Sequence, residues 1–218
     1  MTGSGTSRIG FLGIFNRTVV LTYTGIAVAV LGIWLAQTAR IEGALICLVI
    51  AGICDLFDGP VARRVPRDDD ALRFGQEIDS LADMVSFVAL PVVVAHGLGV
   101  RSIWWVPVLA GYALAGLVRL GYFNAVTRGD ATGGPDGARV RHYRGVPVTY
   151  AALVLPVTAL ATTALPAAVG PVLVGAVLAL LGVLFVLDVP VRKPGGVSYV
   201  VFAALAVAAI TALSFADL

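Results

Sequence analysis

The chain has 218 residues, of which 59% are apolar and only 13% are charged, and its mean hydropathy is +0.95. Soluble domains carry nearly twice this share of charge, so the composition excludes an ordinary soluble protein. Apolar runs of about twenty residues recur, each long enough to cross a bilayer. The net charge of +2 says little about partners, and we expect no nucleic acid among them. The sequence predicts an all-α polytopic membrane helix bundle.

Helical periodicity and turn residues divide the chain into a short leading segment and seven helices. The leading segment, 1–17, lacks a signal-peptide cleavage site, so we expect no processing. The predicted helices cover 18–37, 41–64, 75–98, 102–126, 147–165, 168–188 and 197–216. A charged loop (65–74) and a long polar loop (128–144) interrupt them. The break at Leu165-Pro166 is short, so a six-helix arrangement is the alternative.

Basic residues indicate the orientation of the bundle. If the N-terminus is cytoplasmic, 13 of the 15 Lys and Arg residues fall on the cytoplasmic side, and only Arg40 and Arg101 lie outside. This bias fits the positive-inside rule. It places the polar ends of the second and third helices at the cytoplasmic face and the C-terminus outside.

Four aspartates stand out against this apolar background. They form the pattern Asp55-x-x-Asp58-Gly59-x-x-Ala62-Arg63, followed after eleven residues by Gly75-x-x-x-Asp79-x-x-x-Asp83. Carboxylates near hydrocarbon are costly and rarely lack a partner or a task. Spacings of three and four put each pair on one face of a helix, so two antiparallel neighbouring helices would bring all four together. Such close like charges are tolerable at neutral pH only with bound cations.

The surrounding residues indicate what such cations would do. Hard carboxylate oxygens select Mg2+, Mn2+ or Ca2+ rather than zinc. Gly59 costs about 1 kcal/mol relative to alanine inside a helix, which is tolerable where a nucleotide must approach the backbone closely. Arg63 can meet a phosphate. Together these features indicate metal-assisted chemistry on a phosphate ester at the membrane surface. A structural ion-pair network with Arg63 and Arg119 is the alternative.

The aspartate pattern resembles the signature of the CDP-alcohol phosphotransferase family, whose members displace CMP from a CDP-linked alcohol with a second alcohol. Residues 54–91, 118–124 and 143–149 are similar to integral-membrane phosphatidylserine synthases. The eleven residues between the two halves of the motif exceed the usual number, a departure that affects only the loop. The resemblance implies one transmembrane catalytic domain (1–218), with a juxtamembrane segment (1–17), a six-helix core (18–188) and an additional helix (197–216).

The resemblance also implies roles for the motif residues. Asp55, Asp58 and Asp79 would bind metal, while Asp83 would share the second of two divalent cations, Mg2+ or Mn2+, and act as the catalytic base. The implied CDP-binding residues are Asp55, Asp58, Gly59, Ala62, Arg63, Gly75 and Asp79. The candidates for binding the acceptor alcohol, chosen by position and local resemblance, are Arg119, Asn124, Arg141, Tyr143 and Arg144.

The implied reaction is transfer of the phosphatidyl group from CDP-diacylglycerol to L-serine, giving phosphatidylserine and CMP. The expected setting is the lipid of a bacterial cytoplasmic membrane, with the active site facing the cytoplasm, and a homodimer is expected because family members commonly form one. Choline, glycerol 3-phosphate, inositol and inositol phosphate remain alternative acceptors. A cation or proton transporter that uses the aspartates as its ion site is the alternative of another class.

Overall fold

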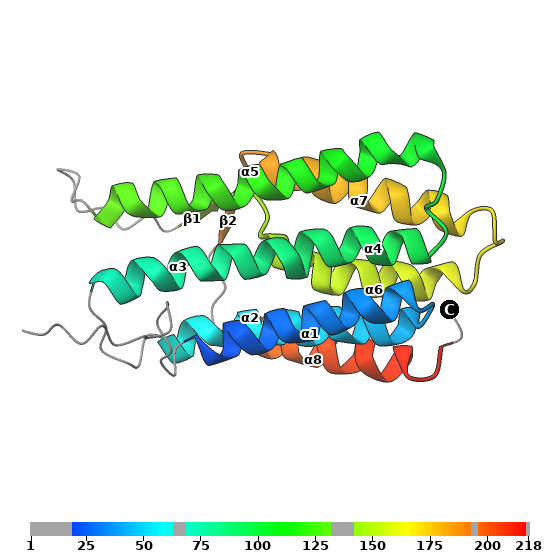
Figure 1. Ribbon diagram of the computed structural model, residues 1–218, viewed down its shortest axis with the longest axis horizontal. Coiled ribbons are helices and arrows are strands. Elements are labelled where there is room, and N and C mark those ends of the chain that lie inside the picture. Colours follow the sequence, from blue (N-terminus) through cyan, green and yellow to red (C-terminus); the bar gives the residue numbers. More distant parts are fainter. Residues whose placement is uncertain (1–18, 63–68, 132–141, 193–195, 217–218) are drawn as a thin grey trace, which may run out of the picture.

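The computed structural model describes residues 19–62, 69–131, 142–192 and 196–216. Helices account for nearly all of this part, and they run side by side along the long axis of the molecule (Figure 1). In chain order they are α1 (Val20–Gln37), α2 (Ile41–Ala62), α3 (Asp69–Asp83), η1 (Met84–Ala89), α4 (Leu90–Gly97), η2 (Ile103–Trp105), α5 (Val106–Ala131), η3 (Val148–Tyr150), α6 (Ala151–Thr162), α7 (Gly170–Val186) and α8 (Gly196–Leu213). The all-α membrane bundle predicted from the sequence is confirmed.

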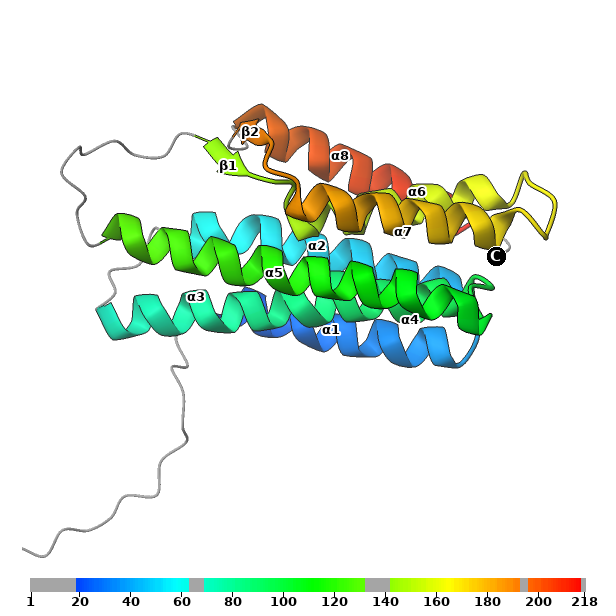
Figure 2. The same cartoon turned by 90° about the horizontal axis from the view of Figure 1, so that it is seen from above.

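The helical elements join into seven continuous helical segments, which are called rods below, as the apolar periodicity predicts. Segments α3, η1 and α4 follow one another without a break, and η2 and η3 lead directly into α5 and α6. The chain also breaks between Thr162 and Gly170, so α6 and α7 are separate helices and the six-helix alternative is wrong. Helix α8 packs against α2 and α6, and the view turned by 90° shows it on the side of the bundle away from α1 and α3 (Figure 2).

Three continuous helical stretches in the described part of the chain are long and apolar enough to cross a bilayer: Val20–Gln37, Ala71–Gly97 and Ile103–Val126. Shorter apolar helices cover Val148–Thr162, Gly170–Val186 and Tyr199–Leu213. The outward faces of these helices carry many exposed valines and leucines, which suit contact with lipid. The protein is an integral membrane protein.

Small residues bring α1 and α2 close together. A Cβ atom added to Gly25 would lie 3.4 Å from the Cβ of Cys54, and one added to Gly32 would lie 2.9 Å from that of Cys47. Small residues allow helices in a membrane to approach closely and gain packing contacts. Both cysteines are free and buried, as expected of small core residues. This packing places α1 directly beside the acidic end of α2.

The third rod differs from its prediction in two respects. It begins at Asp69 rather than at residue 75, because acidic residues are favourable in the first turn of a helix. Its middle is the π-helical segment η1, which follows Asp83 directly. Pro91, just beyond, cannot donate to the carbonyl of Phe87 four residues earlier. The Tyr112 hydroxyl of α5 donates to that carbonyl over 2.6 Å and ties the two rods together.

Part of the predicted polar loop at 128–144 is ordered structure instead. Helix α5 continues to Ala131, and residues His142–Arg144 form strand β1. Strand β1 pairs antiparallel with β2 (Pro190–Arg192), so that Tyr143 lies opposite Val191. The backbone N–H of Gly145 extends the pairing by donating to the carbonyl of Val189 over 2.9 Å. This short sheet fixes the chain that leads into α6.

Candidate active site

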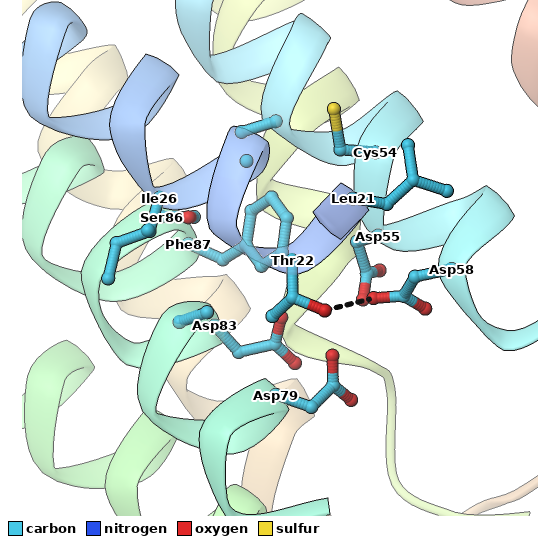
Figure 3. A pocket seen from close by; sticks show the side chains of 13 residues that line it. Leu21, Thr22, Ile26, Cys54, Asp55, Asp58, Asp79, Asp83, Ser86 and Phe87 are labelled. Atoms are coloured by element: carbon cyan, nitrogen blue, oxygen red, sulfur yellow. Dashed lines mark hydrogen bonds between the residues drawn. The ribbon is translucent and has the colours of Figure 1, made fainter. Parts of the chain in front are cut away.

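The four motif aspartates converge at one end of the bundle. Asp55 and Asp58 come from α2, and Asp79 and Asp83 come from α3. Figure 3 shows the four carboxyl groups pointing toward one another between the two helices. Oxygen atoms of Asp55, Asp58 and Asp79 all lie within 4.8 Å of one another. The carboxyl of Asp83 completes the group by contacting that of Asp55.

These carboxyls line a narrow hollow of about 10 Å³ between α1, α2 and the third rod. Its apolar wall includes Leu21 and Ile26 from α1 and Phe87 from η1 (Figure 3). All four aspartates are partly buried, so water screens them incompletely. The site is therefore a small acidic recess with an apolar wall between α1, α2 and the third rod.

The charges in this recess require compensation. Two unit charges 4 Å apart interact by about 4 kcal/mol at the effective dielectric of a protein surface, and here several such pairs are repulsive. Within the described residues, no arginine or lysine forms an ion pair with these carboxylates that would offset the repulsion. The donor set consists of carboxylate oxygens alone, which fits a hard divalent cation such as Mg2+ or Mn2+. The residues present therefore fit a divalent metal centre.

Two threonines from outside the motif contact its carboxylates. The Thr149 hydroxyl, in η3, donates to Oδ2 of Asp55 over 2.8 Å. The Thr22 hydroxyl, in α1, donates to Oδ2 of Asp58 over 3.4 Å (Figure 3). The sequence analysis assigned neither residue to the site. The sequence around these threonines does not indicate a role in the site, because threonines are common in apolar helices and usually bond the backbone of their own helix.

Three further predicted nucleotide-binding residues, Gly59, Ala62 and Gly75, lie on the two helices that carry the aspartates. A Cβ atom added to Gly59 would meet none of the described residues within 4 Å, so they leave the backbone of α2 uncovered there. Gly75 lies on α3 one turn before Asp79. Ala62 is the last residue of α2, whereas Arg63 falls outside the described residues. Their role in binding CDP stays a prediction.

The described acceptor-binding candidates come from helix α5 and from strand β1. Arg119 is 7% exposed and donates to the backbone carbonyls of Val146 (3.2 Å) and Gly145 (3.4 Å). Its guanidinium also lies 5.7 Å from the ring centre of Phe123. These contacts show that Arg119 holds the segment that leads into α6. A role for Arg119 in binding the acceptor stays a prediction.

Asn124 contacts a residue that is next to one of the aspartates in the sequence. Its Oδ1 accepts a 3.1 Å hydrogen bond from Ser80, the residue that follows Asp79. Tyr143 and Arg144 belong to β1, although only their backbone is described, and Arg141 lies outside the described residues. The structure thus connects one acceptor candidate, Asn124, to the helix that carries two of the aspartates.

Comparison with known proteins identifies the family. The chain is 38% identical over 109 residues to the CDP-diacylglycerol–serine O-phosphatidyltransferase of Saccharomyces cerevisiae, which covers 49% of this chain and 38% of the relative. It is 30% identical over 127 residues to the archaetidylserine synthase of Methanothermobacter thermautotrophicus, covering 57% and 49%, respectively. It is 25% identical over 118 residues to the Bacillus subtilis CDP-diacylglycerol–serine O-phosphatidyltransferase, covering 53% and 59%.

The matched region spans less than two thirds of the length of each of these relatives. The family's own sequence profile matches far more of this chain, from residue 15 to residue 187. That range includes every helix from α1 to α7 and all four aspartates, and it ends before α8. The chain belongs to the CDP-alcohol phosphatidyltransferase family.

Proposed function

We propose that this protein is a metal-dependent CDP-diacylglycerol–serine O-phosphatidyltransferase. The observation that carries the proposal is the convergence of four carboxylates from α2 and α3 in a recess with one apolar wall. Such a recess suits a substrate that joins a charged diphosphate to hydrocarbon tails. The acceptor is inferred from relatives, because serine appears in the names of the yeast, archaeal and Bacillus proteins alike.

In this proposal Asp55, Asp58 and Asp79 hold two divalent cations, Mg2+ or Mn2+, and Asp83 shares the second of them. When bound, the cations neutralise the diphosphate and the charge that develops on the leaving CMP. Gly59 leaves the backbone of α2 bare, so the nucleotide can lie against it. Ala62, Arg63 and Gly75 would form the remainder of the nucleotide-binding surface.

The transfer step needs a base as well as charge neutralisation. The serine hydroxyl oxygen attacks the phosphorus atom that carries the diacylglycerol, and a new P–O bond forms as the bond to CMP breaks. Asp83 is assigned to take the hydroxyl proton, because it faces the other carboxyls from one turn deeper than Asp79 (Figure 3). The products are phosphatidylserine and CMP.

The serine carboxylate needs a donor near this point. Asn124 suits this task, because its Oδ1 already accepts from Ser80, which leaves the amide N–H groups as its donors. Arg141, Tyr143 and Arg144 remain candidates, and Arg119 is the least suited, since its guanidinium donates to backbone carbonyls. We further propose that the enzyme works as a homodimer in a bacterial cytoplasmic membrane, with this recess open to the cytoplasm.

CMP release tests the proposal directly. The purified full chain in detergent is supplied with CDP-diacylglycerol and Mn2+ or Mg2+, and L-serine is compared with choline, glycerol 3-phosphate, inositol and inositol phosphate. We expect release that requires both the metal and serine. Release with a different alcohol would keep the chemistry and overturn serine as the acceptor. No release with any alcohol would contradict the enzyme proposal and lead next to a test of cation transport in proteoliposomes.

A further inference from the structure

Thr149 shares with Thr22 a side-chain contact that most threonines of the bundle do not make, and its contact is the shorter of the two. Within the described helices, Thr24, Thr158 and Thr211 each donate to the backbone carbonyl four residues earlier. This is the usual arrangement for a threonine in an apolar helix. The Thr149 hydroxyl instead reaches a carboxylate 94 positions away in the chain, Asp55, over 2.8 Å. A hydrogen bond to a charged group at this distance is among the stronger kinds.

The position of Thr149 is fixed by its immediate neighbours. Pro147 is extended (φ −61°, ψ 143°), and the chain then turns into η3 and α6. Val148 is 3% exposed, and both Ala151 and Ala152 are fully buried against the core. Because these side chains anchor the turn on either side, the hydroxyl of Thr149 is presented to α2 at a set place rather than by a flexible loop.

A second set of contacts holds the same segment from the other side. Arg119 of α5 donates to the carbonyls of Gly145 and Val146, and the N–H of Gly145 donates to Val189. The turn that carries Thr149 is therefore connected to α5, to α7 through its C-terminal extension, and to α2. These connections are backbone bonds or side-chain bonds that are at least partly buried, and together they resist movement of the turn.

The consequence concerns the orientation of Asp55. By donating to Oδ2, Thr149 takes up one acceptor site of Asp55 and restrains the rotation of its carboxyl group, which lies beside those of Asp58, Asp79 and Asp83 (Figure 3). We propose that Thr149 is a positioning residue that holds Asp55 ready to bind a divalent cation. The inference deepens the proposed function, on which it rests for the binding of a metal by the aspartates. Groups that orient metal ligands in this way change metal affinity by about 10- to 100-fold.

The test measures metal binding without substrate. Binding of Mn2+ to the purified full chain in detergent is followed by electron paramagnetic resonance of free Mn2+, for the wild type, Thr149→Val and Thr149→Ser. Valine has the shape of threonine without its hydroxyl, and serine keeps the hydroxyl. We expect Thr149→Val to weaken Mn2+ binding by about tenfold or more and Thr149→Ser to stay within about threefold of the wild type.

Thr158→Val is the matched control. It makes the same change in α6, the helix that directly follows η3, at a buried threonine whose hydroxyl bonds the carbonyl of Val154 rather than an aspartate. We expect it to leave Mn2+ binding unchanged. Thermal unfolding in EDTA shows whether each variant is folded, and Thr149→Ser decides the case if the valine variant is not.

Two outcomes would overturn the inference: wild-type Mn2+ affinity in a folded Thr149→Val variant, or the same loss in the serine variant as in the valine variant. Either result, found alongside serine-dependent CMP release from CDP-diacylglycerol by the wild type, refutes the positioning role alone. Conversely, if Mn2+ binding depends on Thr149 but the wild type releases no CMP, only the proposed function is refuted.

Discussion

Gly145 provides the sharpest test of how the chain leading into α6 is held. Its φ angle is +80°, in the region that side-chain-bearing residues rarely adopt. A Cβ atom at this position would lie 2.8 Å from the carbonyl oxygen of Phe185, 3.3 Å from that of Leu187 and 3.4 Å from Nε of Arg119. The first two neighbours are backbone atoms and cannot rotate away. Gly145→Ala must therefore move either the segment or the end of α7.

The cost follows from two separate effects. A left-handed backbone costs about 1–2 kcal/mol for a residue with a Cβ atom. Overpacking against atoms that cannot yield costs about 1–3 kcal/mol more. Together they predict a loss of about 2–5 kcal/mol, which for a chain of this length lowers the melting temperature by at least about 4 °C. Since Thr149 follows in the same segment, Mn2+ affinity should fall as well.

Thermal unfolding in detergent and EDTA measures the stability, and Mn2+ titration measures the affinity. Gly111→Ala is the matched control, because a Cβ atom at Gly111 in α5 would meet nothing within 4 Å. It should leave the melting temperature unchanged or raise it slightly, as alanine is the better helix former. If Gly145→Ala has the same melting temperature as the wild type, the segment is not the rigid support described above.

Three further predictions concern the site and its frame. Gly59→Ala should keep or raise stability, since its Cβ would meet none of the described residues, yet raise the KM for CDP-diacylglycerol; an unchanged KM would contradict nucleotide contact there. Asp83→Asn should retain CDP-diacylglycerol binding and lose turnover, whereas Asp58→Asn should lose Mn2+ binding; near-wild-type turnover of Asp83→Asn would refute the base assignment. Tyr112→Phe should lower stability by about 1 kcal/mol, because it removes the hydroxyl that donates to the buried carbonyl of Phe87 over 2.6 Å. The melting temperature should fall, and the Mn2+ affinity should equal that of the wild type.

The sequence was sufficient to predict the rods of the bundle and the convergence of the aspartates. Helical periodicity and the lengths of the apolar runs are local properties, so α1, α2 and α5 to α8 appear within a few residues of where they were expected. The pairing of Asp55 with Asp58 and of Asp79 with Asp83 likewise follows from helix geometry. Antiparallel packing of two consecutive helices then suffices to bring the pairs together.

The supporting residues could not be predicted in the same way. The contact of Thr149 with Asp55 joins positions far apart in the chain, and nothing local distinguishes this threonine from Thr158. The pairing of β1 with β2 depends on how α5 and α7 are placed, as only three residues contribute on each side. The π-helical η1 has no clear sequence signal, although such segments often occur at functional sites.

Helix α8 shows how support for the site extends beyond the family match, which ends at residue 187. Ala206 and Ala209 of α8 pack with Val49 of α2 in a small cluster of their own. Close by, a Cβ atom added to Gly52 would lie 2.7 Å from Ala152 and 3.4 Å from Phe202, so α2, α6 and α8 meet at a point without spare room. Asp55 comes three residues after Gly52 on α2, and Thr149 comes three residues before Ala152. The close packing of Gly52 and Ala152 therefore helps to set the distance between the Thr149 hydroxyl and the Asp55 carboxylate. The helix outside the family match therefore packs directly on the part of α2 that leads to Asp55.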